Sequence, residues 1–382
     1  MGKEIIVSAP GKIILHGEHS VVYHKVAIAA SLNRRTTIKL KIQDNDDQLI
    51  KLLLPDVNIE NVFNLTQLQK LFETMPLKST EFTINTPNMI DFPKFLEQIT
   101  NYLENSIQTY NSLTNAQRMA LIAFLYLFIG ILRNSTLNSI EILVISDLKI
   151  SSGTGSSASY CTALAAAFLV YKQNLTSITG EELNIINAWA TFGEQIMHGG
   201  ASSGIDTAIC TYGSLVKFRK GDPIEQIHLQ QSFRIMLIDT LIPRDTKKMV
   251  QKLCDLRKKL PTVVDPILNS MEAIALEALQ CIQTNSNYDN LRELMNINQA
   301  LLCALNVSHE TLDEICKIAK KYNLGGKLTG AGGGGYAIIL LPPTLKNDVE
   351  MNLICDLESL KFNVLTTFIG GSGVQIDKII IN

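Results

Sequence analysis

Residues 139–170 read SIEILVISDLKISSGTGSSASYCTALAAAFLV. The β-branched residues from Ser139 to Ser146 predict a strand, and the almost wholly apolar run from Ala158 to Val170 predicts a buried helix. The Gly/Ser-rich segment from Ser151 to Ser157 joins the two as a loop. Because the first backbone N–H groups of a helix have no partner within it, this order of elements forms a ready anion site. A structural helix cap has the same appearance, so the segment alone leaves both phosphate binding and a structural role open.

The flanking sequence predicts an α+β fold. Before residue 139, β-branched runs and apolar periodicity predict strands at 5–8, 26–31, 36–42 and 49–54 and helices within 61–72 and 92–132. After residue 170, the same patterns predict helices at 182–198 and from about residue 203, and a strand at 213–218. Beyond residue 231 we expect a strand at 233–239, four helices within 245–322, a strand at 336–341, a helix at 345–360 and strands at 362–368 and 374–381.

The length of the chain indicates two domains. The sequence has 382 residues, whereas a single hydrophobic core stops growing at roughly 250 residues. The polar stretch from Arg219 to Gln231 is the candidate boundary. We therefore expect an N-terminal domain over residues 1–225 and a C-terminal domain over residues 226–382.

Composition excludes several classes of protein. Hydrophobic residues make up 46% of the chain and charged residues 18%, which is typical of a globular protein. The formal charge of −2 favours neither nucleic acid nor an anionic membrane as a partner. The seven cysteines form no C-x-x-C pair, which favours a reducing compartment. The longest apolar run, Met119 to Leu132, is shorter than the roughly 20 residues that span a membrane, so we expect a buried helix and a cytoplasmic protein.

A second motif, APGKIILHGEHS, covers residues 9–20 and places Lys12 among small and apolar residues. A lysine in such surroundings neutralises phosphate or lowers the pKa of a neighbouring group. A solvated lysine is the ordinary alternative. His16, Glu18 and His19 are conceivable metal ligands, but no further His or Cys nearby completes a tetrahedral zinc set.

A third motif combines two carboxylates with a glycine-rich loop. Glu194 precedes His198 by four residues on a helix that is otherwise apolar, where an ionised carboxylate is costly unless a partner or a metal compensates it. Asp206 follows the Gly/Ser-rich residues 199–204 and stands before an apolar segment. This pattern predicts a carboxylate at the mouth of a cleft, although a paired structural role for Glu194 stays open.

The last motif is the segment KLTGAGGGG at residues 327–335, directly before the predicted strand at 336–341. Five of its last six residues are glycine, and glycine loses more conformational entropy on folding than any other residue. Such a run indicates backbone that passes close to another group. A flexible linker is the alternative, which the adjoining buried strand disfavours.

Together these segments resemble the GHMP kinase family, named for galactokinase, homoserine kinase, mevalonate kinase and phosphomevalonate kinase. Neither G-x-x-x-x-G-K-[ST] nor the H-R-D and D-F-G motifs of protein kinases occur in the chain, so an ATP-using enzyme must belong to another class such as this one. The segments Ala9 to Val22, Glu194 to Asp206 and Ile242 to Lys247 are most similar to the branch that phosphorylates mevalonate. The resemblance implies the two-domain GHMP kinase fold, with the active site in the cleft between the domains.

The resemblance also implies roles for individual residues. It implies that Asp206 is the catalytic carboxylate with Lys12 as its partner, and that Ser157 and Glu194 are ligands of Mg²⁺. The residues implied to bind the phosphates of ATP are Gly153, Gly155, Ser156, Ser157 and Ala158. The residues implied to bind mevalonate are Lys12, His19, Arg244, Thr246, Gly330 and Ala331.

The implied reaction is phosphorylation of (R)-mevalonate to 5-phosphomevalonate by ATP and Mg²⁺, in the isoprenoid and sterol pathway. Asp206 either accepts the proton of the substrate hydroxyl or only orients it, while Lys12 lowers a neighbouring pKa. The resemblance implies a homodimer and no nucleic-acid or membrane partner. Another GHMP kinase such as phosphomevalonate kinase, and a non-catalytic binding member, are the alternative functions.

Two positions in the phosphate loop depart from the pattern of mevalonate kinases. Those enzymes usually carry a proline before the loop and a leucine where Thr154 stands, whereas Ser151 and Ser152 precede Gly153 here. The segment from His198 to Asp206 is also one residue longer than usual, with Ala201 and Ser202 where a proline is expected.

Overall fold

The computed structural model describes residues 3–43, 47–150, 152–200, 204–229, 232–243, 245–284 and 288–381. Within these residues, the strands form one mixed sheet. They are β1 (Lys3–His16), β2 (Ala27–Gln43), β3 (Leu49–Leu54), β4 (Ile59–Asn64), β5 (Ser139–Ser146), β6 (Leu215–Phe218), β7 (Glu225–Ile227), β8 (Phe233–Asp239), β9 (Gly325–Thr329), β10 (Tyr336–Leu340), β11 (Asn363–Ile369) and β12 (Gln375–Ile381).

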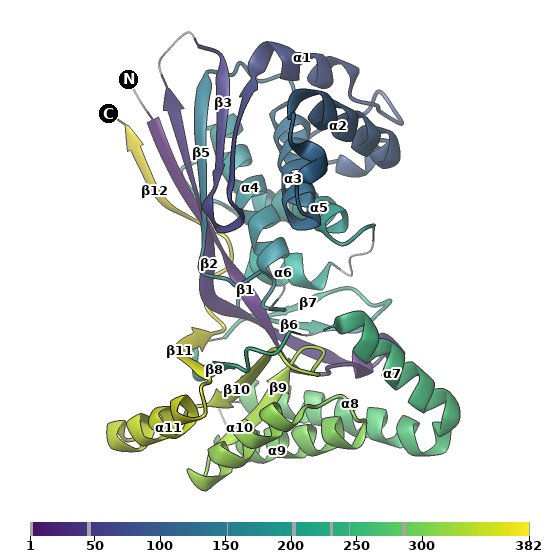
Figure 1. Cartoon of the computed structure of the whole chain (residues 1–382), viewed down its shortest axis with the longest axis vertical. Coiled ribbons are helices and arrows are strands. Elements are labelled where there is room, and N and C mark those ends of the chain that lie inside the picture. Colours follow the sequence, from purple (N-terminus) through teal and green to yellow (C-terminus); the bar gives the residue numbers. More distant parts are fainter. Residues whose placement is uncertain are drawn as a thin grey trace.

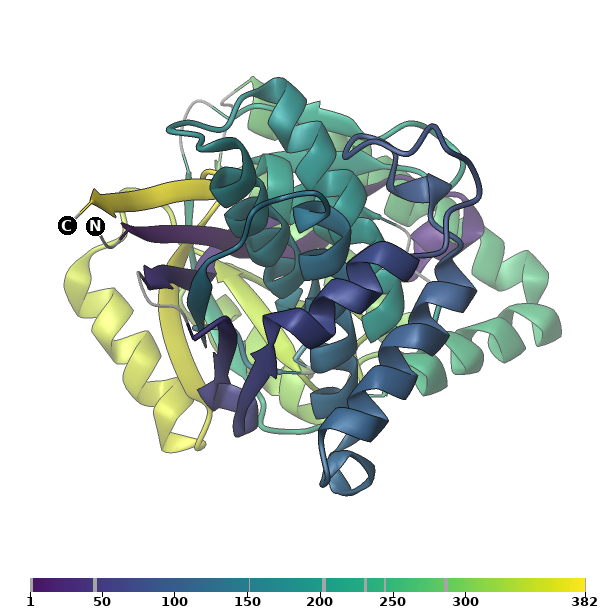
Figure 2. The same cartoon turned by 90° about the horizontal axis from the view of Figure 1, so that it is seen from above.

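Two long strands run through this sheet. β1 and β2 pair antiparallel along nearly their full lengths, and they run from the upper to the lower part of the molecule (Figure 1). The main path of the sheet is β4-β3-β5-β2-β11-β8-β10-β9. β12 pairs with β1, so the strands nearest the two chain ends lie side by side in both views (Figures 1 and 2).

Helices accompany both parts of the sheet (Figure 1). Beside the upper part lie α1 (Leu65–Thr74), α2 (Phe92–Ser106), α3 (Asn115–Leu132), α4 (Ser156–Gln173), α5 (Gly180–Met197) and α6 (Ile205–Tyr212). Around the lower part lie α7 (Thr246–Lys259), α8 (Pro261–Gln283), α9 (Tyr288–Ala304), α10 (Glu310–Lys321) and α11 (Asn347–Ser359).

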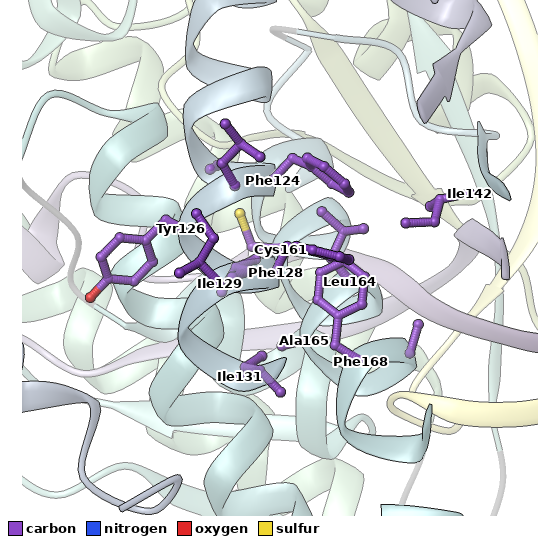
Figure 3. Packing of buried hydrophobic residues seen from close by; sticks show 14 of the residues in the cluster. Phe124, Tyr126, Phe128, Ile129, Ile131, Ile142, Cys161, Leu164, Ala165 and Phe168 are labelled. Carbon is purple, nitrogen blue, oxygen red and sulfur yellow. The ribbon is translucent and has the colours of Figure 1, made fainter. Parts of the chain in front are cut away.

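The largest hydrophobic cluster lies between the upper helices and the sheet. Phe124 and Phe128 of α3 pack with Phe168 of α4, and the rings of Phe128 and Phe168 meet edge to face with centroids 5.4 Å apart (Figure 3). Residues 120–132 of α3 are all buried, which confirms the predicted core helix. Among the described helices, α3 alone has the length and apolar composition of a membrane span, and 72% of it is buried inside the protein. The same packing holds α4, which carries the phosphate loop at its start.

Most predicted elements are present, and β5 and β8 have the predicted bounds. The predicted strands at 26–31 and 36–42 are one strand, β2, and other predictions were wrong or incomplete. β1 does not stop before Pro10 but continues to His16, because the sheet absorbs the Pro-Gly pair as a register shift between Pro10 and Gly11. Residues 61–64 extend β4 rather than beginning a helix, since they pair with β3. The short strand β9 was not predicted, because it consists of the glycine-containing sequence GGKLT.

The proposed boundary at residue 225 stays a prediction. Separate hydrophobic clusters lie in the upper and lower parts of the molecule. The sheet nevertheless continues between the two parts, where Ile369 of β11 pairs with Leu32 of β2. Lys12 lies on β1 of this continuous sheet, where it pairs with Ser31 of β2.

Candidate functional site

The predicted phosphate loop, the Gly/Ser-rich segment before α4, ends at Gly155, a position that suits only glycine. Gly153 and Gly155 have φ angles of 83° and 76°, in the left-handed region. Gly155 is the N-cap of α4, and a Cβ atom there would lie 2.8 Å from Cγ of Lys12. Ser156 and Ser157 begin the 18-residue helix α4, so the predicted phosphate residues, with Ala158 behind them, stand at the positive end of its dipole.

Lys12 joins the phosphate loop to the predicted catalytic carboxylate. Its backbone N–H donates to Thr154 O at 2.8 Å, and its Nζ lies 3.2 Å from Oδ2 of Asp206. The Lys12 side chain is 10% exposed and that of Asp206 30%. Asp206 stands in the first turn of α6, where the helix dipole favours a negative charge. The structure therefore brings the second motif, the phosphate loop and Asp206 together.

Glu194 and Ser157 meet at His198. The hydroxyl of Ser157 lies 3.0 Å from Nε2 of His198, and the same nitrogen lies 4.0 Å from Oε1 of Glu194. Glu194 is buried near the C-terminal end of α5. A carboxylate and a hydroxyl are hard oxygen donors, and Mg²⁺ is bound in proteins by one or two carboxylates together with substrate phosphates. The donor chemistry of these two residues thus fits the predicted magnesium site.

A cavity of about 360 Å³ lies against these groups. One end is polar and contains Lys12, Asp206, His198 and the phosphate loop. The residues of the other end come mainly from β3, β5, α3 and the segment after β3, and they are Leu54, Asp56, Val57, Asn115, Ala116, Met119, Val144 and Ile150. No sequence motif marked this second end, because its residues come from separate elements and have ordinary types.

No site role was predicted for His198, which the sequence shows only as the residue four positions after Glu194. The structure places it between the two candidate metal ligands and in the wall of the cavity. The spacing of four residues on a helix was the available signal, since such residues share one face.

A second cavity, of about 170 Å³, gathers four of the predicted mevalonate-binding residues. His19, Thr246, Gly330 and Ala331 all line it, although they lie far apart in the sequence. Nε2 of His19 donates to Ala331 O at 2.7 Å, which assigns its proton to that nitrogen. Burial lowers the pKa of His19, against the opposing effect of this hydrogen bond. Ile205, next to Asp206, lines the same cavity.

The glycine run after β9 is closely packed backbone. A Cβ atom at Gly332 would lie 2.0 Å from Val307 O, and one at Gly334 would lie 2.7 Å from Ile242 O. Both glycines also have positive φ angles. The run therefore lets the chain pass against two other segments, as predicted, and the linker alternative was wrong.

Glu18 and His16, considered above as metal ligands, both lie in the buried interior. Glu18 forms an ion pair with Lys327, both side chains are fully buried, and Asn298 Nδ2 donates to Glu18 at 3.2 Å. Burial, reinforced by the charge of Lys327, lowers the pKa of His16 to about 3. Among the described residues, no three His, Cys, Asp or Glu side chains are grouped to hold a metal ion.

Arg244, the remaining predicted mevalonate-binding residue, lies outside the described residues, as do Ser151 and the loop residues Ala201 and Ser202. The mevalonate-binding role of Arg244 stays a prediction.

Comparisons with known proteins agree with this geometry. The family model described as GHMP kinases N terminal domain matches residues 120–214, and that described as GHMP kinases C terminal matches residues 270–351. Mevalonate kinase of Homo sapiens is 35% identical over 393 residues, covering 98% of this chain and 96% of that protein. Mevalonate kinase of Arabidopsis thaliana is 31% identical, covering 98% of this chain and 99% of that protein.

Solved structures share the fold. The mevalonate kinase of Methanococcus jannaschii superposes with a TM-score of 0.70 at 23% identity, covering 98% of this chain and 99% of that chain. The L. major mevalonate kinase in complex with R-mevalonate superposes with a TM-score of 0.65 at 22% identity, covering 96% of each chain. The chain therefore belongs to the GHMP kinase family, among the mevalonate kinases.

Proposed function

We propose that this protein transfers the terminal phosphoryl group of ATP to the hydroxyl of (R)-mevalonate, giving 5-phosphomevalonate and ADP. The observation that carries the proposal is the Lys12–Asp206 pair, 3.2 Å apart, at the polar end of the cavity that contains the phosphate loop. Relatives named mevalonate kinase, between 31 and 36% identical over nearly the whole chain, support mevalonate as the acceptor.

The nucleotide occupies the 360 Å³ cavity beside the phosphate loop in this proposal. Its phosphates lie at the start of α4, where unpaired N–H groups of the helix and the dipole attract negative charge. The adenine ring lies in the other end, between side chains such as Val57, Met119 and Val144. An apolar pocket with a few polar groups, here Asn115 and Asp56, is the usual form of a site for a flat heterocycle.

Ser157 and Glu194 hold Mg²⁺ in the proposed complex. The ion supplies neutralisation of the charge that develops on the transferred phosphoryl group. His198 lies within 3.0 Å of the Ser157 hydroxyl and 4.0 Å of the Glu194 carboxylate, so its ring is positioned beside both ligands. Phosphoryl transfer needs positioning and charge neutralisation above all, so these groups suffice without a covalent intermediate.

Mevalonate occupies the smaller cavity. His19, Thr246, Gly330 and Ala331 line that cavity, and its wall continues through Ile205 to Asp206. The guanidinium of Arg244 is assigned to the mevalonate carboxylate because its planar fork suits bidentate contacts with carboxylates. A hydroxyl between the two cavities then faces Asp206 on one side and the phosphate loop on the other.

Asp206 accepts the proton of this hydroxyl as the new P–O bond forms. Lys12, whose Nζ lies 3.2 Å from Asp206, neutralises charge beside the phosphates. Orientation of the hydroxyl without proton transfer is the alternative role for Asp206. The proposed setting is the cytoplasm, where the enzyme acts as a homodimer in the isoprenoid pathway.

A substrate panel tests the proposal. Purified protein is supplied with ATP and Mg²⁺ and with mevalonate, phosphomevalonate, galactose or homoserine in turn, and ADP release is followed by a coupled assay. Of these four acceptors, we expect turnover only with mevalonate. Turnover with only phosphomevalonate would identify another GHMP kinase, and nucleotide binding without turnover on any acceptor would identify a binding protein.

A further inference from the structure

The residues that depart from the family pattern before α4 form a network of hydrogen bonds. Ser152 Oγ lies 2.6 Å from Lys149 O and 2.7 Å from Thr154 Oγ1. Because the carbonyl oxygen can only accept, the single hydroxyl proton of Ser152 goes to Lys149 O. The hydroxyl of Thr154 must then donate to Ser152. Thr154 is 3% exposed, so this bond is largely shielded from water.

An ion pair ties the same segment to the lower part of the molecule. Nζ of Lys149 lies 3.0 Å from Oδ2 of Asp239, the last residue of β8. The Asp239 side chain is 11% exposed, and its second oxygen accepts the N–H of Leu241 at 2.9 Å. Burial and then the charge of Asp239 raise the pKa of Tyr336 to about 12, so its hydroxyl stays a donor beside Asp239 and Ser152.

This network stands where one side of the loop faces a cavity. The cavity has a volume of about 430 Å³, and Thr154, Lys149, Asp239 and Tyr336 line it together with apolar residues and with Arg34, Asp147 and Asn363. Buried backbone keeps one conformation through packed neighbours or through satisfied polar contacts. On the side of the loop that faces the cavity, the polar contacts add to the constraint that packing against Lys12 supplies on the other side.

The network also connects directly to the reacting groups. Thr154 O accepts the backbone N–H of Lys12 at 2.8 Å, and Gly155, the next residue, caps α4. A shift of Thr154 therefore moves both the N–H groups that face phosphate and the backbone of the lysine paired with Asp206.

We propose that the Ser152–Thr154 hydroxyl pair and the Lys149–Asp239 ion pair position the phosphate loop for nucleotide binding. The inference rests on the proposed function only in naming ATP as the ligand. These four side chains are positioning residues, since they act through the loop backbone and not on the substrate.

The first test compares two replacements of Thr154. Thr154→Val keeps the shape and removes the hydroxyl, whereas Thr154→Ser keeps the hydroxyl. Binding of a non-hydrolysable ATP analogue with Mg²⁺ is measured by calorimetry, and KM is measured for both substrates. We expect Thr154→Val to weaken nucleotide binding about three- to tenfold, the effect of one lost hydrogen bond, with KM for mevalonate nearly unchanged.

Thr154→Ser is expected to bind the analogue within about twofold of the unmodified protein. Equal affinity in Thr154→Val and the unmodified protein would overturn the proposal. A loss of the same size in both variants would also overturn it, because that pattern would follow from the methyl group and its packing. Thermal unfolding of each variant shows whether a loss of affinity comes from a folded protein.

The second test is a double-mutant cycle on the ion pair. Lys149→Met, Asp239→Asn and the double variant are compared for nucleotide affinity. We expect each single variant to lose about two- to fivefold, a modest effect because Lys149 is 59% exposed. The double variant should lose less than the product of the two single effects. Strictly multiplicative losses would remove the ion pair from the proposal.

Lys94→Met is the matched control for Lys149→Met. Lys94 pairs with Asp91 at 2.8 Å, is also mostly exposed and lines none of the three cavities, so its replacement should leave nucleotide affinity unchanged.

The binding assay distinguishes failure of the positioning network from failure of the proposed function. Nucleotide binding without mevalonate turnover would refute the proposed function, while the ratio between Thr154→Val and Thr154→Ser would still test the positioning network.

Discussion

Replacing Asp206 with asparagine removes one negative charge and keeps the size of the side chain. In the native site that charge lies 3.2 Å from Nζ of Lys12. At an effective dielectric constant of about 20, two unit charges at this distance attract by about 5 kcal/mol before desolvation is subtracted. Because the Asp206 side chain is 30% exposed, water offsets much of this attraction. The pair therefore matters more to the reaction than to the fold.

The expected loss of rate follows from the lost proton acceptor. We expect kcat to fall at least about 100-fold, which corresponds to about 2.7 kcal/mol in the activation barrier. KM for ATP should change less than about threefold, since the phosphates are held by the start of α4. The free energy of unfolding should fall by about 1–3 kcal/mol, because Lys12 is left without its partner at 10% exposure.

Steady-state kinetics with both substrates varied and thermal unfolding measure these quantities. Asp265→Asn is the matched control, since Asp265 pairs with Arg257 and lines none of the three cavities. Its kcat should equal that of the unmodified enzyme. An Asp206→Asn variant with kcat within threefold of the unmodified enzyme would exclude both the proton-accepting and the orienting role.

Three further predictions concern the metal, the loop and the response to pH. Glu194→Gln should raise the Mg²⁺ concentration that half-saturates the reaction by about tenfold or more, because a hard cation prefers an anionic oxygen. An unchanged Mg²⁺ titration would show that Glu194 has a structural role instead. Gly155→Ala should lower the free energy of unfolding by about 1–2 kcal/mol, because residue 155 has a positive φ angle. It should also raise KM for ATP, because the new Cβ atom meets Lys12. An unaltered melting temperature and an unaltered KM would contradict this prediction. Burial lowers the pKa of His16 from 6.5 to about 3, so the unfolded chain binds the extra proton between these values and stability falls as pH drops below about 6.5, by up to about 1.4 kcal/mol per pH unit. His16→Gln should flatten that slope in denaturant titrations at pH 7, 6 and 5, and identical slopes would show that His16 does not cause it.

The sequence predicted elements where a single physical signal dominates. β5 and α4 follow from a β-branched run and an apolar run separated by glycine, and both formed as predicted. Lys12 and Asp206 drew attention as charged residues beside small and apolar ones, but their pairing in catalysis was implied only by the resemblance to the GHMP kinase family. Their separation of 3.2 Å is a property of the sheet and of α6, which no local pattern encodes.

The sequence did not predict features that depend on distant pairing. β9 contains two glycines and a lysine, and it is a strand because β10 pairs with it along its length. Glu18 was considered as a metal ligand, whereas Lys327, more than 300 residues away, neutralises it in the core. The apolar end of the 360 Å³ cavity combines Leu54 with Met119 and carries no motif at all.

The pairing of β1 with β12 has a consequence for the order in which the protein is made. Residues 3–8 pair with residues 375–381, so β1 lacks one neighbour until nearly the whole described chain has left the ribosome. The nascent chain must meanwhile carry an unpaired strand edge, which is a template for association with other chains. Contacts between residues so far apart in sequence also slow folding. We therefore expect variants truncated before residue 375 to aggregate more readily, because they leave an edge of β1, the strand that carries Lys12, without its neighbour.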